Sequence, residues 1–154
     1  MKLSQNFTVA EFSKSQTALR LGIDNEPQGE HLEAAKALFE NVIQKVRDQF
    51  GPTTINSGYR GPELNKAVGG SATSQHCKGE ACDIEVPGVA NAEVAQWILD
   101  NLEFDQLILE FYTPGIPDSG WVHVSYKAEG DNRGQALTAM KEDGKTVYKA
   151  GLIA

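Results

Sequence analysis

The runs Ala81-Cys82-Asp83-Ile84-Glu85-Val86 and Trp121-Val122-His123-Val124-Ser125-Tyr126 are typical of β-strands. Successive side chains of a strand point to opposite faces of the sheet. This alternation puts Asp83 on the face opposite its apolar neighbours, and it does the same for His123. The two runs therefore predict a sheet with one apolar face and one face that carries polar side chains.

Helices are predicted ahead of these strands. Thr8 and Glu11 have the spacing of a capping box, with Phe7 and Phe12 placed as a hydrophobic staple around it. Apolar residues recur at helical spacing over residues 30–50. A strand is expected over 53–56, a short helix after Pro62, a helix capped by Asn91, and a strand over 104–111. The tail is expected to form two strands, 136–140 and 146–148, around a turn at Asp143-Gly144.

This order predicts an α+β fold, with N-terminal helices packed on a small antiparallel sheet. The length of 154 residues and the hydrophobic content of 40% fit a single domain over 1–154. The net charge of -7 argues against nucleic acid as a partner. The sequence contains no long apolar run, so no membrane span is expected. A monomer is expected.

The first residues lack the apolar core of a signal peptide, so the chain is expected to be cytoplasmic at synthesis. If it acts outside the cell, another route must release it, and phage-type release to the cell wall is one such route.

Three residues predict an open metal site. His76 and Asp83 lie seven positions apart across a turn at Gly79, and His123 lies on the later strand. Three protein ligands leave a fourth tetrahedral position for water, which is the arrangement of a catalytic zinc. The sequence therefore favours a metal hydrolase. The third histidine, His31, is expected to be solvated.

The two cysteines, Cys77 and Cys82, fall inside this loop. They could be packing residues, they could form a disulfide, or one of them could be a fourth metal ligand. A thiolate ligand would close the site and weaken the catalytic interpretation.

Several motifs in one order resemble the M15 zinc peptidases, which include D-Ala-D-Ala carboxypeptidases, cell-wall endopeptidases and phage endolysins. The resemblance covers roughly residues 6–126, and its fold is the one found in hedgehog zinc domains. The motifs are Phe7-Thr8 with Glu11-Phe12, Ser57-Gly58-Tyr59-Arg60, Ser74 to Asp83, Asp105-Gln106-Leu107-Ile108-Leu109-Glu110-Phe111, and Trp121 to Ser125.

The resemblance implies that Zn²⁺ is bound by His76, Asp83 and His123. It implies that Glu110 is the general base that takes a proton from the attacking water and returns it to the leaving amine. Arg60 would face the tetrahedral oxyanion, since a guanidinium stays charged and holds its donors in a plane. The candidate substrate-binding residues are Ser74, Gln75, Tyr59 and Trp121; for Trp121, simple packing is an equal alternative.

One position departs from the wider family. Many members carry the catalytic carboxylate three residues before the last histidine, where this chain has Gly120. The closer branch places a glutamate upstream, as Glu110 is placed here. The stretch between Glu110 and His123 is longer than usual for that branch and contains Asp118, which is a rival base.

The resemblance thus implies a zinc metallopeptidase that hydrolyses peptide bonds of peptidoglycan, as a D,D-carboxypeptidase or an endolysin-like endopeptidase. The alternative is a non-catalytic zinc-binding domain with a structural or recognition role, such as a phage virion protein.

Overall fold

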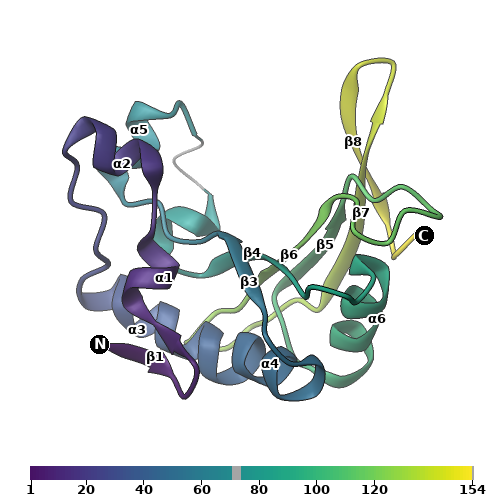
Figure 1. Ribbon diagram of the computed structural model, residues 1–154, viewed down its shortest axis with the longest axis horizontal. Coiled ribbons are helices and arrows are strands. Elements are labelled where there is room, and N and C mark those ends of the chain that lie inside the picture. The colour runs from purple at the N-terminus through teal and green to yellow at the C-terminus, as the bar shows by residue number, and fades with distance from the viewer. Residues whose placement is uncertain (71–73, 154) are drawn as a thin grey trace.

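A six-stranded sheet forms the centre of the molecule in the computed structural model, which describes residues 1–70 and 74–153 (Figure 1). In spatial order its strands are β3 (Thr54–Ser57), β4 (Ala81–Glu85), β6 (Trp121–Ser125), β5 (Gln106–Glu110), β7 (Gln135–Glu142) and β8 (Lys145–Ala150). A separate two-stranded sheet pairs β1 (Lys2–Ser4) with β2 (Phe7–Thr8). The α+β class predicted from the sequence is confirmed.

One strand pair departs from the predicted antiparallel sheet. β7 pairs with β5 in parallel, whereas the other neighbours in the large sheet are antiparallel. The segment 126–134 explains the difference, because it leaves the end of β6 and crosses the start of β5. The amide of Gly134 donates to the carbonyl of Phe104, and the amide of Gln135 to that of Asp105. β7 consequently begins level with β5 and runs in the same direction.

The helices come mostly before the large sheet. They are α1 (Val9–Ser13), α2 (Gln16–Leu21), α3 (Gly29–Leu38), α4 (Gln44–Phe50), α5 (Pro62–Ala67) and α6 (Asn91–Asn101). The helix predicted over 30–50 is continuous, with a π-helical segment, Phe39–Ile43, between α3 and α4. None of the described helices combines the length and apolarity needed to cross a membrane.

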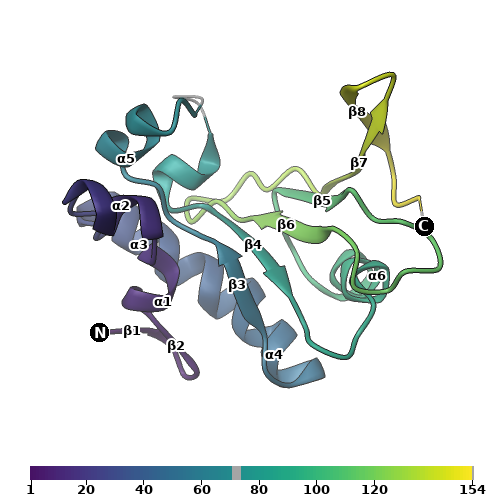
Figure 2. The same ribbon diagram turned by 45° about the horizontal axis from the view of Figure 1, so that its top comes forward.

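The apolar face of the sheet packs against helices. Figure 2 shows α3 and α4 on one side of the sheet, with α6 beside the far strands. The core residues that the central strands contribute are fully buried: Ile84, Leu107, Leu109, Val122 and Val124. Alternation along the strands therefore leaves the opposite face free to carry polar side chains.

The predicted capping box begins α1. Thr8 Oγ1 accepts from the amide of Glu11, and Glu11 Oε1 accepts from the amide of Thr8. Phe7 and Phe12 flank this cap and meet the same ring, Phe39, with centroid distances of 5.2 and 5.1 Å. The cap thus fixes the N-terminal segment on the long helix.

The predicted cap of α6 is wrong. Ala90 is the N-cap, and Asn91 is buried as the first helical residue. The Asn91 side-chain amide donates to Glu85 Oε1 and to the carbonyls of Ser119 and Gly120. Asn91 is used for these tertiary contacts, which anchor the loop that enters β6.

The tail forms the predicted hairpin. Asp143 and Gly144 both have positive φ, at 50° and 78°, which fits a two-residue turn between β7 and β8. Figure 1 shows this hairpin rising on one side of the sheet, while α2 and α5 rise on the other.

Candidate metal centre

The central strands bring two candidate ligands together. Asp83 on β4 lies directly opposite His123 on β6, and His123 lies opposite Ile108 on β5. These residues occupy the face away from the core. The register between the strands therefore sets the separation of the Asp83 and His123 side chains.

His76 comes from a short 3-10 helix, Gln75–Lys78, ahead of β4. Ser74 caps this helix, and its Oγ accepts from the His76 amide. Gly79 ends it with a φ of 76°, and a Cβ at this position would collide with the His31 carbonyl, so the turn requires glycine. The loop thereby returns the chain so that His76 faces Asp83.

The hydrogen bonds of His76 orient its ring. Its Nδ1 lies 2.7 Å from the Gly58 carbonyl oxygen, which can only accept, so Nδ1 carries the proton. The Nε2 atom is therefore unprotonated in the neutral ring, and it lies 3.4 Å from Asp83 Oδ1. A ring held by a backbone carbonyl in this way is typical of metal-binding histidines.

The three donor groups fit a zinc ion. His123 Nδ1 lies 2.9 Å from Asp83 Oδ1, and one ligand atom from each of the three residues lies within 4.8 Å of the others. Two ligands about 2.1 Å from a tetrahedral zinc are about 3.4 Å apart, so only small adjustments are needed. His76, Asp83 and His123 could thus hold a metal ion, with two imidazoles and one carboxylate as donors.

The negative charge of Asp83 suits metal binding. Burial acts to raise the pKa of Asp83, but the neighbouring imidazoles of His123 and His76 together outweigh burial and lower the pKa to about 2. Asp83 is therefore ionised at neutral pH, as a metal ligand must be.

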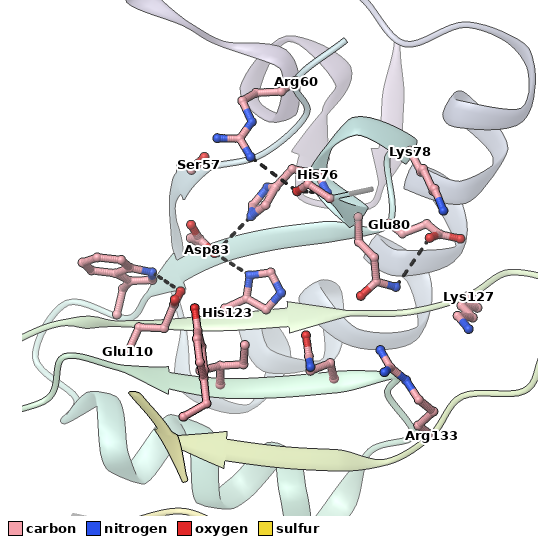
Figure 3. A pocket seen from close by; sticks show the side chains of 16 residues that line it. Ser57, Arg60, His76, Lys78, Glu80, Asp83, Glu110, His123, Lys127 and Arg133 are labelled. Carbon is pink, nitrogen blue, oxygen red and sulfur yellow. Dashed lines mark hydrogen bonds and ion pairs between the residues drawn. The ribbon is translucent and has the colours of Figure 1, made fainter. Parts of the chain in front are cut away.

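Glu110 lies beside these residues at the end of β5 (Figure 3). Its Oε2 accepts a 2.6 Å hydrogen bond from Trp121 Nε1, and the two residues are opposite each other in the sheet. Burial raises the pKa of Glu110, and the negative charge of Asp83 raises it further. A raised pKa brings a carboxylate closer to the range in which it both accepts and returns a proton.

Arg60 approaches from the other side of the site (Figure 3). Its Nη2 donates to Ser74 Oγ at 3.4 Å, and its buried Nε has no hydrogen-bond partner among the described residues. A buried guanidinium donor without a partner is costly. The Arg60 residue lines the cavity, so its charge lies at the site.

These residues line one cavity of about 680 Å³. Its lining contains Ser57, Arg60, Ser74, Gln75, His76, Lys78, Glu80, Asp83, Gln106, Ile108, Glu110, Trp121, His123, Lys127, Arg133 and Tyr148. The structure thus brings into one cavity all the sequence-predicted site residues except Tyr59.

Tyr59 lies outside the lining of this cavity. It is buried in the core against Phe12, and its hydroxyl lies 2.7 Å from Nδ1 of His31. His31 is accordingly half-buried rather than solvated. We assign Tyr59 to packing, because its hydroxyl already has a partner away from the cavity.

Two predicted substrate contacts have clear structural partners. The Gln75 amide donates to Asp105 Oδ2 at 3.0 Å and to Glu80 Oε1 at 3.5 Å, which ties the metal-binding loop to the start of β5. Trp121 holds Glu110, as described above. Both side chains also line the cavity, so these contacts position them there.

The rival base lies elsewhere. Asp118 is exposed and lines a different hollow, beside Val86 and Val89. Gly120 has a φ of 63°, and a Cβ on it would collide with the backbone of Glu110 and Phe111. Position 120 therefore cannot carry a side chain here without a shift of the backbone, and of the two candidate bases it is Glu110 that lines the cavity.

Both cysteines are buried, and no disulfide joins them in the described part of the chain. Cys82 lies on the core face of β4 opposite Val124, and burial raises the pKa of its thiol. Among the described residues, the group that could hold a metal includes neither cysteine. These contacts support the packing interpretation for Cys82.

Sequence reasoning did not assign several residues that line the cavity to the site, among them Lys78, Lys127, Arg133 and Tyr148. Lys127 had a usable signal, since it is four positions after His123 and so falls on the same face of an extended chain. Tyr148 had no local signal, because its place depends on the parallel pairing of β7 with β5.

The Peptidase M15 family model matches residues 5–125, which includes the three donor residues, Arg60 and Glu110. A search of curated proteins found no significant match to the sequence. M15 peptidases are zinc-dependent, and the cavity contains a donor set that suits zinc. The chain belongs to the M15 peptidase family.

Proposed function

We propose that this protein is a zinc-dependent peptidase that hydrolyses peptide bonds in peptidoglycan, with water as the nucleophile. The observation that supports this most directly is the position of Glu110. It lines the same cavity as His76, Asp83 and His123, and a hydrogen bond from Trp121 holds it there. A carboxylate held beside an open three-ligand site is what water-mediated hydrolysis requires.

Zinc held by the three ligands would lower the pKa of a water molecule and polarise the scissile carbonyl. Glu110 takes the proton of the attacking water on its carboxylate and later delivers that proton to the leaving amine. Trp121 keeps one carboxylate oxygen oriented through Nε1, which leaves the other oxygen free for proton transfer.

Arg60 has the positive charge needed to stabilise the oxyanion that forms during the reaction. As water adds to the carbonyl carbon, negative charge develops on the carbonyl oxygen, and a guanidinium stabilises that charge. Arg60 lines the same cavity as Glu110 and the three metal donors, which supports this role for its guanidinium. Ser74 accepts from the same guanidinium and limits its movement.

Mass spectrometry of soluble products from purified peptidoglycan tests the proposal. Zinc-loaded protein should release new peptide termini, and their sequence identifies the bond and separates a carboxypeptidase from an endopeptidase. Glu110→Ala should bind one zinc per chain yet lose about two to four orders of magnitude in rate, because the proton acceptor is gone.

Asp118→Ala is the matched control, since it removes the other carboxylate considered for this role and should cleave at the wild-type rate. Full activity in Glu110→Ala would refute the role of Glu110. An absence of products from wild-type protein with one zinc bound would refute hydrolysis and favour a non-catalytic zinc-binding domain.

A further inference from the structure

The cavity has a cationic end. Lys78, Lys127 and Arg133 line it together with Glu110 and the metal-binding residues. Figure 3 shows these three cations grouped on the side of the pocket away from Glu110. The chain as a whole carries a net charge of -7, so this grouping runs against the overall charge.

One of the three cations is already paired. Arg133 donates from Nε and Nη2 to the fully buried carboxylate of Asp105, at 3.0 and 2.8 Å. Lys127 Nζ lies 3.9 Å from the same carboxylate, which is too long for a hydrogen bond. Asp105 therefore pairs mainly with Arg133, and Lys127 forms only the longer ion pair with it.

Lys78 is exposed and forms no ion pair with any described residue. The nearest acidic group in the lining is Glu80, which is buried and hydrogen-bonded by Gln75. Burial raises the pKa of Glu80, and the charge of Glu129, which is exposed in a neighbouring hollow, raises it further. The charges of Lys78 and Lys127 lower the pKa of Glu80. Among the described residues, Lys127 thus has only its long ion pair with Asp105, Lys78 has no ion pair, and both ammonium groups line the cavity where an incoming carboxylate can meet them.

The position of Lys127 in the sequence sets an upper limit on its distance from the metal donor His123, and so on its distance from the bond that is cut. It follows His123 by four residues, so its Cα lies at most about 13 Å along the strand direction from that ligand. An extended peptide covers this distance in about four residues. An anionic group about three to four residues from the scissile bond would therefore reach the two lysines.

We propose that Lys78 and Lys127 form a subsite for a carboxylate of the peptide substrate, several residues from the bond that is cut. The inference rests on the peptidase function proposed above and names a substrate feature that the enzyme selects. Lys127 lies beyond residue 125, where the family match ends, so the subsite is partly built from this chain's own C-terminal segment.

Synthetic stem peptides test the subsite. Each carboxylate remote from the scissile bond is replaced in turn by its amide, and kcat/KM is measured for the acid and the amide. Wild type should prefer one acid over its amide by about tenfold, since a charge-assisted hydrogen bond is lost in the amide. The double variant Lys78→Gln/Lys127→Gln should reduce this ratio to near one, mainly by raising KM for the acid.

Lys45→Gln is the control for loss of positive charge, because Lys45 is exposed on α4 and does not line the cavity. It should keep the wild-type ratio. A second measurement does not depend on turnover. The acid peptide is titrated calorimetrically into zinc-loaded Glu110→Ala and into the same variant that also carries Lys78→Gln and Lys127→Gln. Binding should weaken about tenfold when both lysines are replaced.

The outcomes separate the two proposals. If wild type cleaves acid and amide peptides equally, the subsite is refuted and the peptidase function stands. If wild type cleaves no peptide, the peptidase function fails and the titration decides on the subsite. Lysine-dependent binding of the acid would then support the subsite, and equal binding of acid and amide would refute it.

Discussion

Two regions of the chain line the same cavity but contribute different things. Residues 5–125, which match the family, supply the metal donors and Glu110, each held by a further contact such as Gly58 or Trp121. Residues 126–150 supply Lys127, Arg133 and Tyr148, whose side chains are more exposed. Under the functions proposed above, we expect the first region to determine the chemistry, and the second to help determine which substrate fits together with Lys78 of the first region.

Removing a metal donor should have the largest effect. His76→Ala leaves only two of the three donors, so we expect the zinc content to fall from one per chain to near zero and hydrolysis to stop. Zinc analysis after dialysis measures the first effect, and product release from peptidoglycan measures the second. His31→Gln replaces a histidine that lies outside the cavity, so it should keep its zinc. Stoichiometric zinc in His76→Ala would overturn the ligand set.

Asp105 joins the two regions, and its loss should reduce stability. It lies at the start of β5, it is fully buried, and it binds Arg133 from the tail and Gln75 from the metal loop. The hydrogen bond and charge of Arg133 lower the pKa of Asp105 to about 2. In the unfolded chain the value is about 3.9, so ionised Asp105 stabilises the fold by about 2 to 3 kcal/mol.

The sign of this effect can be measured. Because the folded pKa is the lower one, the stabilisation is present above about pH 4 and is lost as the pH falls toward 2. Urea unfolding should show Asp105→Asn less stable than wild type by about 2 kcal/mol at pH 7, with a smaller gap near pH 2.5. Asp118→Asn changes an exposed carboxylate and should match wild type at both pH values. A gap independent of pH would show that charge is not the cause.

Trp121→Phe tests whether a residue of the first region acts on the chemical step, and so on kcat, without acting on substrate binding, and so on KM. The variant keeps an aromatic ring but loses the donor to Glu110, so we expect kcat to fall about tenfold with KM unchanged. This hydrogen bond lowers the pKa of Glu110, so its loss should move the acidic limb of the pH–rate profile to higher pH. Trp97→Phe, which alters a ring packed on Phe50, should leave the profile in place. An effect on KM alone would assign Trp121 to substrate contact.

Local sequence pattern predicted much of the first region. The strand period of two predicted that Asp83 and His123 share a face, and the capping box predicted the start of α1. Asn91 was misassigned because its side chain serves contacts with Glu85 and the 119–120 loop, which are distant in sequence. Local patterns report such partners poorly.

The second region needed long-range information. The hairpin at Asp143-Gly144 was predicted, since its turn is local, but its pairing partner was not. The pairing with β5 depends on the segment 126–134 crossing the start of that strand. The side chains that this pairing brings to the cavity were therefore beyond prediction from spacing.

Tyr148 should give the smallest effect and the finest test of the comparison. In the sheet register Glu110 lies opposite Ala139, and Ala139 lies opposite Tyr148. Tyr148 is thus two strands, or about 10 Å, from Glu110. The small side chain of Ala139 leaves room between them, and Tyr148 lines the cavity with 57% of its surface exposed.

We expect Tyr148→Ala to raise KM about threefold, because one partly exposed aromatic contact is lost. The variant should leave kcat and zinc content unchanged. Lys149→Ala is the neighbour on the opposite face of β8, paired with Glu142, and should have no effect on either constant. Steady-state kinetics on one stem peptide measures all three proteins. A large fall in kcat for Tyr148→Ala would mean that the tail takes part in the chemical step, and the division between the two regions would then be wrong.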